Sequence, residues 1–426
     1  MTMPPDGLTG AIFAAEGIQD GCTLLNGPMG CKFYHGYMSD RQFPRVGSMD
    51  PLSFREKFYF GQPRVPCTFL EEEDYIGGPS GKLREIIRSL GENVDGPIVI
   101  INSPGASLIG EDIDHLVREM GLTERCMVVE APGFSRPASD CFDETIVEVL
   151  RWLKPSKVES KGDSVNIIGA SMLQRHWQGT IEEIARLIGP MGLTIQAAVG
   201  AGSTSEQLRT SSAARVNISI CREYCMKTGE WYDDNFGIKT IQIPSGAPIG
   251  FDSTEEWIRA IAYALDRDPS PSLKIVASAR ATAYREIARF NSLSGLPKGS
   301  SFSIKADSSI ALPLTRWLYN YLGMYPVAIE LSEGSDLAYK ESLVTFLNEA
   351  GMADAWKRPV HETLADFVFA DGATTTLMEK STMCRIGTEI SLPKSHRIDL
   401  LPRTIFGVTG SLYLIEQILN GFWGAD

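Results

Sequence analysis

Cysteines are the residues of this chain whose type and spacing best suit chemistry, and their surroundings differ. Cys31 ends the segment LLNGPMGC, in which two glycines let the backbone turn sharply and leave a thiol on a loop. Cys22 lies nine residues earlier and Cys67 lies 36 residues later, each beside a turn. Thiolates on separate loops can converge on an iron–sulfur cluster, which needs no fixed local spacing. A set of dispersed structural cysteines is the alternative that these residues leave open.

Cys221 is a second candidate, because it follows an expected strand over 214–220 and precedes REYCMKTGEWYDDNFGIK. Sites form at such strand ends. Cys225 could bind a metal together with Cys221, or one of the two could simply pack. His396, in SLPKSHRIDLLPR, also follows an expected strand, but a lone histidine is more often a surface or core residue than a ligand. No CxxC pair occurs, which argues against a zinc ribbon or a thioredoxin-like motif.

Alternating strands and helices must position these residues. Short apolar runs such as PIVIINSPG (97–105) end in Gly, Ser, Pro or Asp turns and lead into helical spacing, and the pattern recurs along the chain. It predicts an α/β fold with parallel sheets and right-handed crossovers. Ligands of such sheets bind in loops at the carboxyl ends of strands. One such loop is expected over 131–143 and holds Ser139 and Asp143.

Two polar stretches that contain proline, 154–163 and 266–272, divide the chain into three parts. Each part is large enough for a small doubly wound sheet. We therefore predict three Rossmann-like domains, over 1–158, 159–269 and 270–426.

Charge and hydropathy exclude several classes of function. Forty Lys and Arg against 53 Asp and Glu give a net charge of −13, which disfavours general binding of nucleic acid or anionic membranes. No apolar run approaches the ~18 residues that a membrane-spanning helix needs. The N-terminus lacks the basic region of a secretory signal, so we expect a cytoplasmic protein whose cysteines are thiols, metal ligands or core residues.

Several segments together resemble nitrogenase component 1 and its relatives over nearly the whole chain. GLTGAIFAAEGIQDGCTLLNGPMGC is similar to the family's N-terminal segment, whose last cysteine ligates an interfacial iron–sulfur cluster, and this implies Cys31 as a ligand. Further similarity is found in EEEDYIGGPSGKLREII (71–87), INSPGASLIGEDI (101–113) and EAPGF (130–134). The resemblance implies three Rossmann-like domains that surround a cluster site.

The chain departs from the family at two other cluster positions. These fall near Asp6 and at Pro104, and neither is a thiol. We predict Cys22 and Cys67 as substitutes, with Asp6 as a further candidate ligand. The resemblance implies a P-cluster-like or [4Fe-4S] cluster at this interface.

A second match concerns a large iron–sulfur cofactor. The segment that starts at Cys221, sixteen residues before Gly237, resembles the catalytic-subunit segment in which a cysteine holds one end of that cofactor. The family's cofactor-binding histidine precedes a helix that starts with G-x-x-G. Gly407 and Gly410 provide that start here, and an alignment with a one-residue gap places the histidine at His396. The resemblance therefore implies Cys221 and His396 as cofactor ligands.

The substrate is expected to differ from dinitrogen. The glutamine and histidine that line the cofactor in nitrogenase correspond here to about Ser139 and Asp143, which we predict as proton donors or substrate-positioning groups. Methylthio-alkane reductase, which breaks carbon–sulfur bonds, is the relative that fits best. The alternatives are a tetrapyrrole reductase or cyclase of the same superfamily (nickel-sirohydrochlorin or protochlorophyllide), a cofactor-assembly scaffold, and a binding fold without metal.

The resemblance also implies partners. A separate ATP-dependent iron–sulfur reductase would supply electrons, in agreement with the absence of a GxxxxGK[ST] motif from this chain. A second component-1-like subunit would complete a heterotetramer that acts on a small-molecule substrate, with neither nucleic acid nor a membrane as partner.

Overall fold

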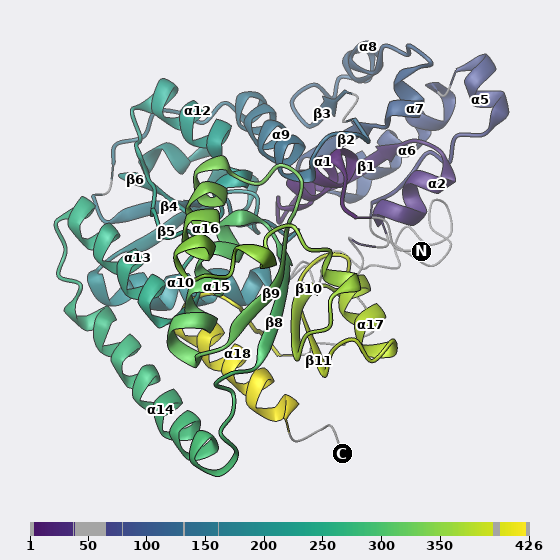
Figure 1. Cartoon of the computed structure of the whole chain (residues 1–426). Coiled ribbons are helices and arrows are strands. Elements are labelled where there is room, and N and C mark those ends of the chain that lie inside the picture. The colour runs from purple at the N-terminus through teal and green to yellow at the C-terminus, as the bar shows by residue number, and fades with distance from the viewer. Residues whose placement is uncertain are drawn as a thin grey trace.

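The computed structural model describes residues 4–36, 38, 65–78, 80–130, 133–160, 162–394 and 401–422. Within them the chain forms three β-sheets flanked by helices (Figure 1), with strand orders β1-β2-β3, β5-β4-β6-β7 and β11-β10-β8-β9. Adjacent strands pair in parallel in each sheet, as the sequence predicts. The strands are β1 (Cys22–Asn26), β2 (Ile98–Asn102), β3 (Cys126–Val129), β4 (Ser164–Ile168), β5 (Thr194–Ala198), β6 (Val216–Ser219), β7 (Thr240–Ile241), β8 (Ser301–Ala306), β9 (Tyr325–Leu331), β10 (Phe367–Asp371) and β11 (Ile386–Ser391).

Helices connect the strands and cover the sheets. The longer ones are α1 (Gly7–Glu16), α6 (Ser80–Asn93), α9 (Ala138–Leu153), α10 (Trp177–Ile188), α12 (Met226–Phe236), α13 (Gly250–Leu265), α14 (Ser270–Ser294), α15 (Ser308–Leu322), α16 (Leu337–Glu349), α17 (Gly372–Lys380) and α18 (Gly407–Gly421). The shorter ones are α2 (Met29–Cys31), α5 (Glu72–Gly77), α7 (Pro104–Ser107), α8 (Ile113–Glu119) and α11 (Ser205–Arg209). Such crossover helices let successive strands run in the same direction.

Three of the strands are buried on both faces. Every residue of β1, β2 and β4 is buried, because helices cover both sides of a parallel sheet. One large core joins α1 to the middle and third sheets, and a separate cluster fills the other face of the first sheet. The first sheet therefore shares one of its two faces with the rest of the molecule.

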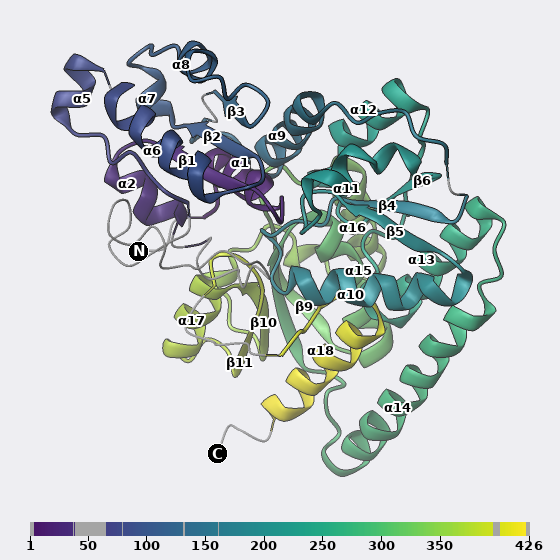
Figure 2. The same ribbon diagram turned by 180° about the vertical axis from the view of Figure 1, so that it is seen from behind.

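Each sheet takes its strands from one of the three predicted domains, but some helices cross between them. Helix α9 of the first predicted domain packs against α12 of the middle one, and the C-terminal helix α18 of the third packs against α10 and α13 of the middle one (Figure 2). The domain boundaries at 158 and 269 stay predictions. No helix in the described ranges is long and apolar enough to cross a membrane.

Candidate metal centres

Cys31 and Cys67 lie together just beyond the carboxyl end of β1. The Cys67 thiol donates a hydrogen bond to the Gly27 carbonyl oxygen at 3.2 Å. A Cβ atom on Gly27 would stand 3.6 Å from the Cys31 Cβ and 2.7 Å from the Ser103 hydroxyl oxygen. The missing side chain of Gly27 therefore leaves room for Ser103 beside Cys31. Cys31 and Cys67 are 8% and 1% exposed.

A short extended stretch carries Cys67 to this position. It runs beside the end of β1, where the Leu25 amide donates to the Pro66 carbonyl at 2.8 Å and the Thr68 amide donates to the Leu25 carbonyl at 3.1 Å. The Thr68 hydroxyl also donates to Asn26 Oδ1 at 2.8 Å. This pairing fixes the register that places the Cys67 thiol at Gly27.

Both cysteines are protonated thiols at neutral pH in the metal-free chain. Burial raises the pKa of Cys31, although a hydrogen bond from Ser103 opposes the rise. Burial also raises the pKa of Cys67 to about 12, despite the nearby positive charge of Lys32. Because thiolates are the metal-binding form, each cysteine must release a proton when it binds iron.

Cys22 lies at the opposite end of β1. It pairs with Ile98 at the start of the strand, whereas Asn26 pairs with Asn102 at the end, and four residues of strand span roughly 13 Å. Its side chain packs in the hydrophobic cluster on the other face of the sheet. The turn beside Cys22 precedes its strand instead of following it, so the structure does not bring this predicted ligand to Cys31 and Cys67.

Asp6 is used as a helix cap. Its Oδ1 accepts hydrogen bonds from the Thr9 amide at 2.9 Å and the Thr9 hydroxyl at 2.8 Å at the start of α1. Asp6 also pairs with His35 Nε2 at 3.0 Å, and His35 Nδ1 lies 2.8 Å from the Cys31 carbonyl oxygen. Asp6 and His35 thus hold the Cys31 backbone, a role of His35 that no local sequence pattern indicates.

The segments at the carboxyl end of the first sheet carry exposed apolar side chains. They come from the segments that follow β1, β2 and β3 and from α5, where Tyr75 lies near both cysteines. Ile76 is 91% and Leu108 is 89% exposed. Large contiguous apolar patches are typical of protein contacts. We call it the apolar rim; it consists of Met29, Phe33, Tyr34, Tyr75, Ile76, Leu108 and Phe134.

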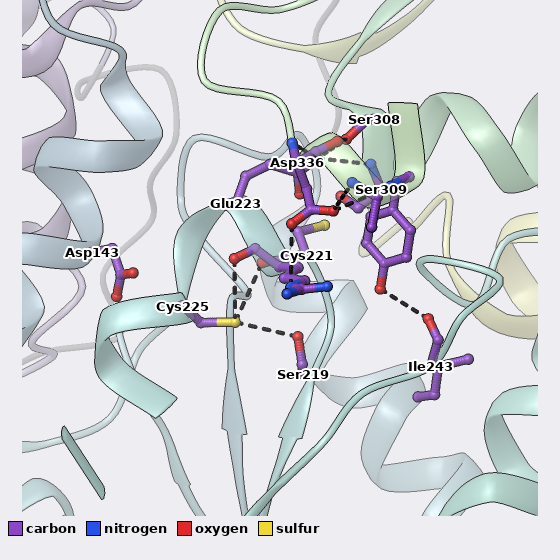
Figure 3. Close-up of polar contacts among 12 residues, drawn as sticks. Asp143, Ser219, Cys221, Glu223, Cys225, Ile243, Ser308, Ser309 and Asp336 are labelled. Carbon is purple, nitrogen blue, oxygen red and sulfur yellow. Dashed lines mark hydrogen bonds and ion pairs between the residues drawn. The ribbon is translucent and has the colours of Figure 1, made fainter. Parts of the chain in front are cut away.

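Cys221 lies in the core, directly beyond β6, and is fully buried. Ser309, at the start of α15, lies near this thiol, and its buried hydroxyl has no hydrogen-bond partner among the described residues. The Cys225 thiol contacts the Ser219 hydroxyl at 3.2 Å and the Cys221 carbonyl oxygen at 3.5 Å. Figure 3 shows the two sulfur atoms pointing in different directions, so the two thiols do not form a joint site.

Glu223 ties the Cys221 turn to the third sheet. Its Oε1 accepts hydrogen bonds from the Ser308 hydroxyl at 2.6 Å, the Ser309 amide at 2.8 Å and the Asp336 amide at 3.5 Å (Figure 3). Arg222 Nε contacts Asp336 Oδ2 at 3.2 Å. The carboxyl ends of β6, β8 and β9 therefore meet at Cys221.

The surroundings of Cys221 are buried and acidic. Burial and the charge of Glu223 raise the pKa of Cys221 well above its usual range. The same two causes raise the pKa of Asp307 to about 7, and its Oδ2 accepts a hydrogen bond from the Tyr224 hydroxyl at 2.9 Å. Glu223 Oε2 is buried and accepts no hydrogen bond from the described residues.

This arrangement fits a bound polar or metal-containing group. A buried carboxylate oxygen without a partner is costly, and a thiol is a soft ligand for iron. The second predicted ligand, His396, lies outside the described residues. Among those that are described, no three His, Cys, Asp or Glu side chains are placed to hold a metal ion.

Asp143 and Ser139 lie on helix α9 and not in a loop, because the helix begins directly after Pro137. Asp143 accepts hydrogen bonds from the Lys227 and Thr228 amides, at 2.7 and 2.9 Å, at the start of α12. In Figure 3 it lies on the far side of Cys225 from Glu223.

The Ser139 hydroxyl is buried and has no hydrogen-bond partner among the described residues. A Cβ atom on Gly334 would stand 2.5 Å from it, so this hydroxyl packs closely against that turn. The chemical roles of Ser139 and Asp143 stay predictions.

Fold and sites define a parallel α/β protein with a cysteine at the carboxyl end of each of two sheets. Residues 7–422 match the family model described as nitrogenase component 1 type oxidoreductase. The chain belongs to this family and is an oxidoreductase, as the sequence resemblance implied.

Similar proteins agree with this assignment. One subunit of the light-independent protochlorophyllide reductase of Heliobacterium modesticaldum is 24% identical over 410 residues, which cover 93% of this chain and 74% of that protein. The corresponding protein of Chloroflexus aurantiacus is 23% identical over 361 residues, 81% of this chain and 62% of its own length. A solved structure titled nitrogenase Cp1 at pH 6.5 matches with a TM-score of 0.76 and 15% identity, covering 100% of this chain and 94% of that one. This structural match confirms the predicted fold.

Proposed function

We propose that the chain is a catalytic-component subunit of a two-component reductase of the nitrogenase type. Cys31 and Cys67 hold part of an iron–sulfur cluster at a contact with a second component-1-like subunit. The observation that carries this proposal is the convergence of two buried thiols at Gly27, directly behind the apolar rim.

Residues around the two thiols fit such a cluster. A bound iron–sulfur cluster accepts and passes on single electrons, with a potential set by its thiolate ligands and their hydrogen bonds. This chain provides two soft sulfur donors and a hydroxyl, Ser103, that hydrogen-bonds to one of them. His35 and Asp6 hold the Cys31 backbone in place.

The remaining ligands come from the second subunit. The described residues place only Cys31 and Cys67 at this site, whereas iron–sulfur clusters of this size take four cysteine ligands. Contact with a second subunit would cover the apolar rim and exclude water from the thiols. A heterotetramer, and a separate ATP-dependent reductase that delivers electrons, complete the proposed assembly.

For the substrate, a tetrapyrrole is the first candidate. The similar curated proteins named above are subunits of light-independent protochlorophyllide reductase, and the match to one of them covers 93% of this chain. In this case the chain needs one small cluster and an apolar pocket for the macrocycle, and the Cys221 side chain only packs in the core.

Reduction at a second, larger iron–sulfur cofactor is the other candidate, with cleavage of carbon–sulfur bonds in methylthio-alkanes as the reaction. The surroundings of Cys221 favour it, because Glu223, Asp307 and Tyr224 make this buried region acidic and polar. The unpaired Glu223 Oε2 supports a bound partner that the protein alone does not supply. Cys221, with His396, would hold the cofactor, and Ser139 and Asp143 stay candidate proton donors.

Iron analysis of the complex tests the proposal and separates the candidates. The chain is purified anaerobically with its partner subunits as wild type, Cys31→Ala, Cys221→Ala and Cys126→Ala. Cys126 is a matched control, because it is 3% exposed and packs in the first-sheet core. Loss of iron from Cys31→Ala alone supports one interfacial cluster and the tetrapyrrole candidate. Additional loss from Cys221→Ala supports the large cofactor, and full iron in Cys31→Ala contradicts the proposal.

A further inference from the structure

A polar side chain stands at the carboxyl end of each strand of the first sheet. Asn26 ends β1, Asn102 ends β2, and Glu130 directly follows β3. Asn26 Nδ2 donates a hydrogen bond to Asn102 Oδ1 at 2.9 Å, and Asn102 Nδ2 donates to Glu130 Oε2 at 2.8 Å. The Thr68 hydroxyl donates to Asn26 Oδ1 and extends the row at its other end. We call these four side chains the polar row.

The middle sheet has a similar pair of asparagines, but its ends are not bonded. Asn166 and Asn217 pair on the adjacent strands β4 and β6, and Asn166 Nδ2 donates to Asn217 Oδ1 at 3.0 Å. The other amide atoms, Asn166 Oδ1 and Asn217 Nδ2, are buried without a partner among the described residues. In the first sheet both ends of the buried pair are bonded, one to an exposed carboxylate and the other to Thr68. The polar row therefore ends at the residue that follows Cys67.

From this we infer that Thr68 is the positioning residue of Cys67: its hydroxyl, oriented by the polar row, binds the Gly27 backbone and holds the Cys67 thiol there. The inference deepens the proposed function and rests on it, because the position of this thiol matters to a cluster only where Cys67 is a ligand. Its structural part concerns this chain alone, so it can be tested without iron.

Donors and acceptors of the polar row fit together in one order. A carboxylate only accepts hydrogen bonds, so Glu130 requires a donor from Asn102, whose oxygen in turn accepts from Asn26. The Asn26 oxygen then accepts the single proton of the Thr68 hydroxyl at 2.8 Å. A lone pair of that hydroxyl is left to accept the Gly27 amide at 3.0 Å.

The Gly27 carbonyl is the group through which this orientation affects the thiol. It accepts the Cys67 thiol at 3.2 Å and the Leu70 amide at 3.0 Å. The Thr68 hydroxyl oxygen lies 3.4 Å from the same carbonyl oxygen. Because Asn26 takes the Thr68 proton at a shorter distance, the hydroxyl does not compete with the thiol for this acceptor.

Backbone strain on both sides of Cys67 increases the need for such an attachment. Val65 and Phe69 have left-handed backbone conformations, with φ of +50° and +48°. These conformations cost free energy in residues other than glycine and persist only where the surroundings hold them. Backbone pairing with Leu25 ends at the Thr68 amide. The Thr68 hydroxyl is therefore the next contact along the stretch that resists relaxation at Phe69.

Alkylation of Cys67 in the native, metal-free full chain tests this positioning. N-ethylmaleimide labelling is followed at each cysteine by peptide mass spectrometry, and the rate at Cys126 reports general opening of the same sheet. Thr68→Val keeps the side-chain shape but leaves the Gly27 amide without its partner, so Cys67 is expected to label about tenfold faster. Thr68→Ser keeps the hydroxyl and should label near the wild-type rate.

Matched variants separate positioning from the loss of a buried polar group. Thr23→Val removes a buried hydroxyl of β1 that has no partner among the described residues, and should leave the Cys67 rate unchanged. Asn102→Ala lets the Asn26 amide turn around, and should raise the Cys67 rate about threefold. Asn217→Ala removes the corresponding amide of the middle sheet and should not change it. Asn102→Ala also carries the test where Thr68→Val does not fold.

Two labelling results would overturn the inference. One is an equal Cys67 rate in Thr68→Val and Thr23→Val. The other is an equal rise at Cys67 and Cys126, which would show general opening of the sheet. An unchanged rate in Asn102→Ala would overturn the contribution of the polar row.

A second readout uses the loaded complex. Where iron in the complex depends on Cys67, Thr68→Val should shift the cluster's electron paramagnetic resonance signal, and Thr68→Ser should restore the wild-type signal. An unchanged signal in Thr68→Val contradicts the positioning role. Full iron in Cys67→Ala instead contradicts the proposed ligand alone, because the labelling result does not depend on bound iron.

Discussion

The Cys31 site and the Cys221 site both lie at carboxyl ends of parallel strands, but one faces outward and the other is closed. Loops of a single sheet form the Cys31 site, behind the exposed side chains of the apolar rim. Elements of two sheets enclose the Cys221 site, and Glu223 and Asp336 bind across the junction. The first site is open to ligands from another subunit, whereas the second is held together within the chain.

Replacement of a thiol at the outward site is expected to have the largest effect. Cys67→Ser should abolish the interfacial cluster in the anaerobic complex, because an alcohol is a poor ligand for iron and the four-cysteine ligand set is then incomplete. Iron content and the cluster's spectroscopic signal measure the effect. Cys126→Ser, also at a buried position, is the control. Equal iron content in the two variants would show that Cys67 is not a cluster ligand.

The second-largest effect is expected when charges are introduced into the apolar rim, which should weaken subunit association. Ile76→Asp with Leu108→Asp should lower the affinity for the second subunit, about a hundredfold, because central apolar contacts cost about 2 kcal/mol or more when lost. Analytical ultracentrifugation of the mixture measures the affinity. Leu364→Asp is the control, since Leu364 is 68% exposed and belongs to the third-sheet region. Unchanged affinity in the double variant would place the subunit contact elsewhere.

Loss of the Asp143 cap is expected to lower the stability of the fold moderately. Asp143→Ala should lower the free energy of unfolding by about 1–3 kcal/mol, because it leaves the Lys227 and Thr228 amides without partners. Urea denaturation measures this, with Asp140→Ala on the same helix as the control. A stable Asp143→Asn variant that loses turnover would favour the predicted proton donor over a purely structural cap.

The smallest expected effect is a pH dependence of the free energy of unfolding. It comes from Glu144, at the edge of the α9–α12 junction. Hydrogen bonds from Arg136 and Lys227 lower the pKa of Glu144 to about 2, from 4.5 in the unfolded chain. The folded pKa is the lower one, so these bonds stabilise the fold above pH 4.5 and lose that effect as the pH falls towards 2. Because Glu144 is partly exposed, the loss should be below about 1 kcal/mol.

Glu144→Gln tests this assignment. The variant should show a flatter decline of stability between pH 4.5 and 2 than the wild type, measured by urea denaturation at each pH. An identical decline would assign the pH dependence to other carboxyl groups.

Local sequence signals were sufficient for the fold and for the position of Cys31 shortly after a strand. Apolar runs followed by glycine turns predicted the parallel sheets, but GPMGC leads into the short helix α2 (Met29–Cys31) and not into a loop that carries the thiol. Cys22 shows where such signals stop, because a turn beside a cysteine does not tell whether the thiol begins or ends its strand. Pro137 could have corrected the expected loop at Ser139, since proline is common at helix starts.

Long-range pairings could not be predicted from the sequence. Glu223 lies 86 residues before the Ser309 amide that it binds, and Asp307 had the position of an ordinary helix cap. The role of His35 depends on Asp6, 29 residues earlier. These contacts follow from how the sheets and helices pack, which no local pattern records.

Iron retention by the chain with and without its second subunit tests the central claim most directly. After anaerobic reconstitution with iron and sulfide, gel filtration should leave the isolated chain without a stable cluster and the two-subunit complex with one cluster per pair. That result is expected because this chain provides only part of the ligand set. A stable, complete cluster in the isolated chain, or a complex that holds its cluster when both Cys31 and Cys67 are alanine, would contradict the account.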